Sequence, residues 1–137
     1  MPLKTPLEVA LAFVDRISHQ DVNGLAALMT EDHLFVDGAG QEVRGRERMR
    51  QGWGVYYSWV PDYNIHIEDV LEDGDLIALL GRAGGTYRPA QGKTEDCRWE
   101  IPAAWKAVVR GNQVAEWRVY ADNEPMYRLM EAYPPPE

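Results

Sequence analysis

The chain has 137 residues, 45% of them hydrophobic, so it is long enough for one domain with a core and too apolar to be disordered. Fourteen Lys and Arg residues against 22 Asp and Glu residues give a net charge of −8. A field of that sign repels nucleic-acid phosphates and anionic lipids, which excludes both as expected partners. We expect residues 1–137 to form a single domain.

The cysteine count and the hydropathy pattern indicate a compartment. Cys97 is the single cysteine, so no internal disulfide can form, as is usual in a reducing compartment. The N-terminal residues include no apolar leader, and no run approaches the ~18 apolar residues of a membrane span. We therefore expect a soluble, cytoplasmic protein.

Helix signals fill much of the first 60 residues. Thr5 is an N-cap candidate, Pro6 stands at the first helical position, and Glu8 completes a capping box. The apolar residues of this helix recur with helical spacing: Leu7, Leu11, Val14 and Ile17. A shorter helix begins at Asp21, and a third is expected over 46–60, although its glycines weaken it.

From residue 64 the hydrophobic period changes to two, which predicts strands. Ile65 and Ile67 alternate with polar neighbours, and a turn at 72–75 leads into a second strand over 76–87. Asp122 or Asn123 then caps a last helix. The other expected segments are a strand at 34–37, a turn at 89–93 that contains Lys93, and strands at about 98–109 and 114–121.

Helices followed by an antiparallel meander predict an α+β layer fold. We expect three N-terminal helices packed on one strongly curved sheet, antiparallel or mixed, and a short C-terminal helix. This shape is a cone, and it leaves an internal pocket between sheet and helices where small ligands bind.

This order of elements resembles the SnoaL-like branch of the nuclear transport factor 2-like superfamily. The resemblance runs from Leu7 to Tyr133 and rests on the helix pair, the strand ending at Asp37, Gly45, and the segment 117–122. The superfamily includes isomerases, cyclases, dehydratases, epoxide hydrolases and proteins that only bind or assemble. The resemblance therefore implies the fold but not the activity, which must be inferred from the residues of the pocket.

Asp37 is the first candidate catalytic residue. It lies in a loop similar to the one in which the steroid delta-isomerases of the superfamily carry their proton-abstracting aspartate. A carboxylate at the mouth of an apolar cavity is desolvated, which poises it for proton transfer. Alternatively, Asp37 stabilises the glycine-rich turn at 38–40 by accepting backbone N–H groups. The isomerases also need a second acid, where this chain has Ala103 and Ala104, so steroid isomerisation is not expected.

Arg82 matches the arginine of limonene-type epoxide hydrolases, which use an Asp-Arg-Asp arrangement. Gly84 and Val119 stand where the two acids should be, so that mechanism is not expected either. Arg82 could instead bind an anionic ligand group bidentately, or form an ion pair with a neighbouring acid. The SnoaL-type cyclases place an essential acid on the late strands, where Glu100 is the nearest acid and its face is not fixed.

His33 is the one histidine with a candidate catalytic role. It lies four residues before Asp37, on the same face of a regular strand, and could form a His/Asp pair as in the dehydratases of the superfamily. Otherwise it is a surface residue. None of the three histidines has the spacing of a zinc site, so we expect no metal and no cofactor.

Five Trp and seven Tyr residues are many for a chain of this length. Some fill the core, and others are expected to line the cavity and bind a small hydrophobic molecule. The candidates are Trp53, Tyr57, Trp99, Trp105, Trp117, Tyr120 and Met126. The resemblance also implies a homodimer through the outer sheet face, where an exposed aromatic side chain would be part of the interface.

Two functions follow as hypotheses. The first is a pocket protein for a hydrophobic molecule; if it is catalytic, it is a cofactor-free isomerase, cyclase, dehydratase or hydratase, with Asp37 transferring the proton and Arg82, Tyr57 or Tyr120 polarising an oxygen. The alternative is a non-catalytic ligand-binding or dimeric assembly module. Several carboxylates converging on the cavity would favour the enzyme, whereas a lone Asp37 bonded to the turn at 38–40 would favour the binder.

Overall fold

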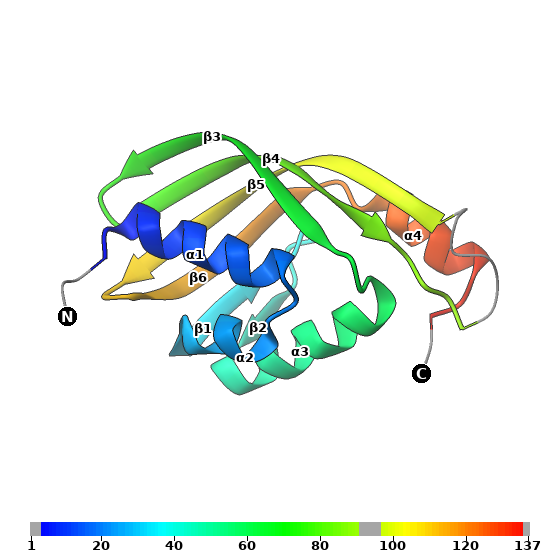
Figure 1. Ribbon diagram of the computed structural model, residues 1–137, viewed down its shortest axis with the longest axis horizontal. Coiled ribbons are helices and arrows are strands. Elements are labelled where there is room, and N and C mark those ends of the chain that lie inside the picture. The colour runs from blue at the N-terminus through cyan, green and yellow to red at the C-terminus, as the bar shows by residue number, and fades with distance from the viewer. Residues whose placement is uncertain (1–3, 91–96, 136–137) are drawn as a thin grey trace.

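A computed structural model describes residues 4–90 and 97–135 (Figure 1). The elements in chain order are α1 (Pro6–Ser18), α2 (Val22–Ala27), β1 (Met29–Val36), β2 (Glu42–Arg44), α3 (Arg46–Trp59), β3 (Asn64–Asp73), β4 (Leu76–Thr86), β5 (Arg98–Arg110), β6 (Gln113–Ala121) and α4 (Glu124–Ala132). The α+β class, the three N-terminal helices and the C-terminal helix are confirmed. The turn predicted at 89–93 lies partly outside the described residues, and Lys93 lies wholly outside them.

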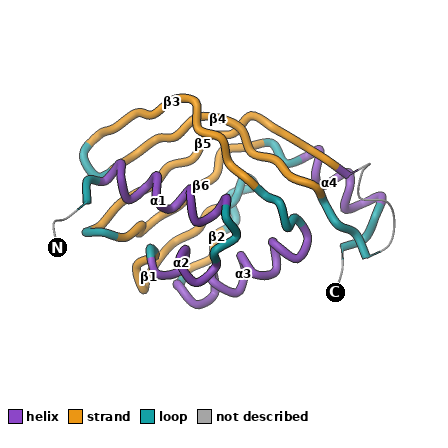
Figure 2. Tube along the Cα trace, in the orientation of Figure 1, coloured by secondary structure: helices purple, strands orange, loops and turns teal. Residues whose placement is uncertain are grey.

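The strands form one six-stranded mixed sheet in the order β2-β1-β6-β5-β4-β3. β3 to β6 are an antiparallel meander, whereas β1 pairs with β6 in parallel and β2 folds back on β1. Figure 2 shows the sheet arching over α1, with α3 along its open side and α4 beyond its far end. The curvature predicted for the sheet is therefore present, and its concave face looks toward the helices.

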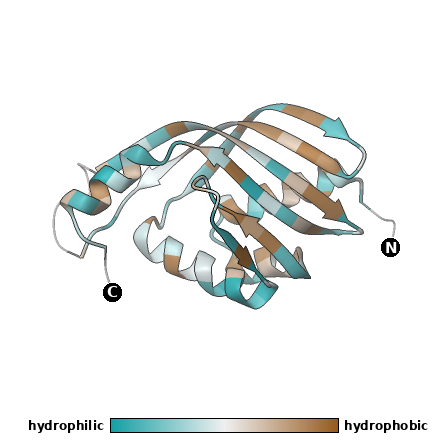
Figure 3. Ribbon diagram, turned by 180° about the vertical axis from the view of Figure 1, so that it is seen from behind, coloured by the Kyte–Doolittle hydropathy of each residue, from teal (hydrophilic) through white to brown (hydrophobic). Residues whose placement is uncertain are grey.

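Alternation along the strands separates a buried face from an exposed one. In β5 buried residues alternate with exposed or half-buried ones along the whole strand, and Figure 3 shows the matching alternation of hydrophobic and hydrophilic colour along the long strands. The inner face carries the core tryptophans Trp105 and Trp117, each 1% exposed. The outer face carries Lys106, Arg118 and Glu116 as an ion-paired group.

The predicted capping box fixes the start of α1. Thr5 Oγ1 accepts the Glu8 backbone N–H at 3.1 Å, and Glu8 Oε1 accepts the Thr5 N–H at 3.0 Å. The buried face of α1 is rotated from the predicted stripe, because Leu11 is 39% exposed. The residues of α1 that pack into the core are Val9, Ala10, Phe13, Val14 and Ile17.

A close approach of two backbones at Gly81 accompanies the bend of the sheet. The register of β3 on β4 shifts between Ile67 and Asp69, directly beside Gly81. A Cβ atom at Gly81 would lie 1.9 Å from the His66 carbonyl oxygen, far inside van der Waals contact. The bulge and the glycine together let β3 fold inward over the helices. None of the helices in the described ranges combines the length and hydropathy needed to cross a membrane.

Gly81→Ala is expected to lower the free energy of unfolding by more than about 2 kcal/mol, because the methyl group meets backbone that cannot rotate away. Chemical denaturation measures the change. Gly54→Ala in α3 is the control: no atom lies within 4 Å of its added Cβ, and alanine favours a helix over glycine by up to about 1 kcal/mol. Equal stabilities for the two variants would contradict this account of the bend.

Candidate functional site

A cavity of about 600 Å³ opens between the inner face of the sheet, α3 and α4. Its wall is formed largely by eight aromatic side chains: Phe35, Trp53, Tyr56, Trp59, Tyr63, Trp105, Trp117 and Tyr127. Asp37 is the one carboxylate among the described residues that line it, and that lining includes no Lys, Arg or His. Asn123 and Gln41 add two amide side chains. The cavity is therefore an aromatic chamber with few polar groups and one acid.

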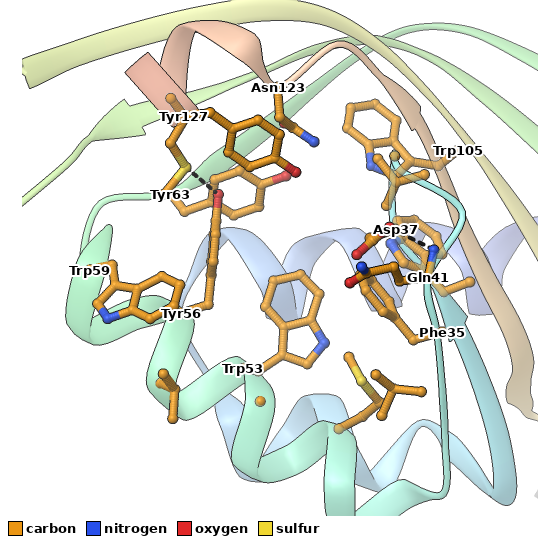
Figure 4. A pocket seen from close by; sticks show the side chains of 18 of the residues that line it. Phe35, Asp37, Gln41, Trp53, Tyr56, Trp59, Tyr63, Trp105, Asn123 and Tyr127 are labelled. Carbon is orange, nitrogen blue, oxygen red and sulfur yellow. Dashed lines mark hydrogen bonds between the residues drawn. The ribbon is translucent and has the colours of Figure 1, made fainter. Parts of the chain in front are cut away.

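Asp37 lies directly after β1, in the turn that leads to β2. Its Oδ1 accepts the backbone N–H groups of Ala39 and Gln41, each at 2.9 Å, and its own N–H donates to the Gln41 carbonyl. The turn-stabilising alternative for Asp37 is thus present in the structure. Oδ2 accepts no hydrogen bond from the described residues, and Figure 4 shows the carboxyl beside Gln41 at the side of the cavity opposite Trp59.

Arg82 does not line the cavity, which corrects its placement at the site. Its neighbours Gly81 and Ala83 face inward, so strand alternation turns Arg82 to the outer face. There Nη1 lies 3.2 Å from Glu100 Oε1 and Nε lies 3.5 Å from Glu68 Oε2. Arg82 therefore forms ion pairs with neighbouring acids, as the alternative interpretation expected. Glu100 likewise lies outside the cavity.

His33 is fully buried behind the cavity wall and forms no pair with Asp37. Its Nδ1 donates to the Val114 carbonyl oxygen at 2.7 Å, and its ring packs against Phe13. Burial lowers the pKa of His33, against the opposing effects of the Val114 hydrogen bond and two nearby carboxylates. It is therefore a neutral core residue, contrary to both roles considered for it.

Four of the seven predicted binding residues line the cavity: Trp53, Trp105, Trp117 and Met126. Tyr57 does not, because its hydroxyl donates to the Ile17 carbonyl at 2.7 Å inside the core. Trp99 packs behind Tyr63, with ring centroids 6.1 Å apart. Tyr120 is 53% exposed on the outer face, because Trp117 and Val119 take the inner positions of β6.

Sequence reasoning missed several lining residues on α3, α4 and the loops: Gln41, Tyr56, Trp59, Tyr63, Asn123 and Tyr127. Tyr56 follows Trp53 by three residues, so its helical face was readable. Asp122 or Asn123 was expected as a cap; Asp122 accepts the Glu124 N–H, and the Asn123 side chain makes no capping bond. Tyr63 carried no sequence signal beyond its place after Pro61.

One tyrosine of the wall, Tyr56, joins α3 to α4. The Tyr56 hydroxyl donates to Met126 Sδ at 3.5 Å. Burial raises the pKa of Tyr56 and of Tyr63, so both stay protonated near neutral pH. No group of three or more His, Cys, Asp or Glu side chains that could hold a metal ion occurs in the described part of the chain.

Residues 10–117 match the family model of the SnoaL-like domain, which is most of the chain. The chain belongs to the SnoaL-like domain family. The resemblance inferred from the sequence is thereby confirmed. No curated protein sequence matches the chain.

Solved structures of this family and its superfamily share the fold. A protein of Shewanella denitrificans labelled a SnoaL-like polyketide cyclase is 16% identical, with a TM-score of 0.78 over 93% of this chain and 97% of that one. An LEH-like epoxide hydrolase of M. tuberculosis is 16% identical, with a TM-score of 0.75 over 93% and 90%. A Catenulispora acidiphila protein with a ketosteroid isomerase-like fold, in complex with trimethylamine, is 20% identical, with a TM-score of 0.72 over 85% and 86%. At these identities the likeness establishes the fold and leaves the activity open.

Protonation of His33 is expected to destabilise the protein. Because its pKa in the folded chain lies below the ordinary value, the unfolded chain takes up the proton first as the pH falls. Stability is then full above about pH 6.5 and falls below it, by about 1.4 kcal/mol for each pH unit down to the folded-state pKa.

Thermal denaturation between pH 7 and pH 5 measures this dependence. His33→Gln, whose amide can still donate to Val114, should flatten the slope. Equal slopes in wild type and His33→Gln would rule out His33 as the titrating group.

Proposed function

We propose that this protein binds a small, largely hydrophobic molecule in the cavity between the sheet, α3 and α4. The observation that carries the proposal is the cavity of about 600 Å³, which is lined by eight aromatic side chains and a few polar groups. This volume and this ratio of apolar to polar lining are typical of small-molecule sites. Asp37, Gln41 and Asn123 would orient the ligand.

The lone carboxylate supports binding over acid–base catalysis. Asp37 is tied to its own turn through Oδ1, and no second acid joins it in the described lining. Val119 lies in the wall at the position where the epoxide-hydrolase arrangement would need an acid. On β5 the buried position is taken by Ala103, where the steroid isomerases need their second acid.

Proton transfer by Asp37 is the second candidate function. It is favoured by one observation: Oδ2 accepts no hydrogen bond from described residues, while the side chain lines the cavity. A protonated Tyr63 hydroxyl in the same wall could polarise a substrate oxygen. The reactions within reach are cofactor-free isomerisation, cyclisation, dehydration or hydration.

The homodimer through the outer sheet face stays a prediction. Leu80, Ala104 and Tyr120 lie side by side in register across β4, β5 and β6. Leu80 and Tyr120 are 37% and 53% exposed. This apolar row supports the prediction, because an apolar core within a polar rim is typical of dimer interfaces.

Ligand binding is tested with N-phenylnaphthylamine, a neutral dye whose fluorescence rises in apolar surroundings. Wild type should bind it, and Gly52→Trp should weaken binding about tenfold, because Gly52 lines the cavity and an indole there fills part of it. Gly54→Trp, two residues along the same helix and outside the lining, is the matched control and should bind as wild type does. Equal affinities for all three proteins would place the dye outside the cavity, and absence of binding would contradict the proposal.

Proton transfer is tested with beta-tetralone, an aromatic ketone whose acidic C–H exchanges with deuterium. Wild type should accelerate the exchange observed by NMR, and Asp37→Asn should lower the rate at least about 100-fold. The asparagine carbonyl can still accept from Ala39 and Gln41, so the turn is kept. Exchange at the uncatalysed rate with wild type, or equal rates for both proteins, would contradict the catalytic candidate and leave binding intact.

A further inference from the structure

We infer that the cavity selects a hydrophobic amine in its cationic form, an aryl or alkyl ammonium, over neutral and anionic molecules of the same shape. The inference rests on the proposed binding function and names the class of ligand. Three features of the described lining carry it: its charge, the angles between its rings, and the free oxygen of Asp37.

The charge of the wall has one sign. Among the described residues of the wall, Asp37 is the one charged side chain, so an anionic group beside them would lose water and gain no positive partner from them. Arg82, the basic side chain first expected there, is paired with Glu68 and Glu100 on the outer face. The net charge of −8 adds a long-range field that attracts cations.

Neighbouring rings of the wall stand at steep angles to one another. Tyr56 is perpendicular to Trp53, at 89° and 6.1 Å between centroids, and perpendicular to Tyr63, at 90° and 5.1 Å. Phe35 stands at 74° to Trp53 on its other side. Rings at right angles turn their π faces in different directions, as Figure 4 shows for Trp53, Tyr56 and Tyr63. A cation within about 6 Å of such faces is attracted by the ring quadrupoles.

The free oxygen of Asp37 discriminates against neutral ligands. Any molecule that fills the cavity displaces water from around Oδ2, which accepts no hydrogen bond from described residues. A neutral molecule without a donor would leave a desolvated, unpaired carboxylate, which is costly. An ammonium group neutralises it, and a protonated amine also donates a hydrogen bond.

The test compares three probes that share a phenol ring and differ in one head group. They are para-hydroxyphenyl-trimethylammonium, para-tert-butylphenol, and para-hydroxybenzenesulfonate, with positive, neutral and negative heads of similar shape. Isothermal titration should give the ammonium an affinity at least about tenfold above that of the neutral probe, with the sulfonate weakest. The neutral probe is the more hydrophobic, so hydrophobic burial alone predicts the opposite order.

Variants assign the preference to the named groups. Asp37→Asn should lower the affinity for the ammonium about tenfold and raise that for para-tert-butylphenol, because the desolvated carboxylate is no longer present. Tyr56→Leu should weaken binding of the ammonium several-fold more than binding of the neutral probe, because the substitution removes an aromatic ring face. Tyr120→Leu on the outer face is the control and should bind all three probes as wild type does.

The outcomes separate the inference from the proposed function. Binding of the neutral probe as tight as or tighter than the ammonium overturns the inference and keeps the pocket. Binding of none of the three probes overturns the pocket itself. A preference for the ammonium that survives both Asp37→Asn and Tyr56→Leu places the cation elsewhere and also overturns the inference.

Discussion

The parallel pairing of β1 with β6 is the constraint on which the polar end of the cavity depends. Phe35 lies opposite Trp117 and Val36 opposite Arg118, so both strands end at the same edge of the sheet. The Asp37 turn after β1 therefore meets the segment that leads from β6 into α4. Gly38 packs there so tightly that a Cβ atom would lie 2.6 Å from the Ala121 carbonyl oxygen and 3.1 Å from Asn123 Nδ2. This contact brings an acid and an amide from distant parts of the sequence to one side of the cavity.

Local signals in the sequence were sufficient for most of the elements. The capping box at Thr5 and Glu8 depends on neighbouring residues alone, and it formed as expected. The meander from β3 to β6 follows from a period of two interrupted by turns. The short β2 strand was not anticipated, because three residues carry no usable periodicity and its pairing with β1 is set by the turn.

The candidate site was less predictable, because it depends on which face each side chain takes. Arg82 was wrongly expected in the site, because Gly81 and Ala83 take the inner positions of β4 and Arg82 lies on the outer face. Similarity to a motif does not determine which face of the sheet a residue occupies. Trp117 was correctly expected in the lining, and Val119 joins it there because alternation in β6 continues from one to the other. Asn123 and Tyr63 lie outside regular elements, where no period exists to indicate the direction of a side chain.

The fold and the size of the cavity depend largely on different groups. Strand pairing joins backbone groups, whereas the volume of the cavity is set by the side chains that line it and by the absence of one at Gly52. A Cβ at Gly52 would find one neighbour within 4 Å, Met49 Sδ at 3.9 Å. This position on α3 is thus a place where ligand size can diverge among descendants of the chain, or be redesigned, by a single substitution that leaves the hydrogen-bonded scaffold untouched.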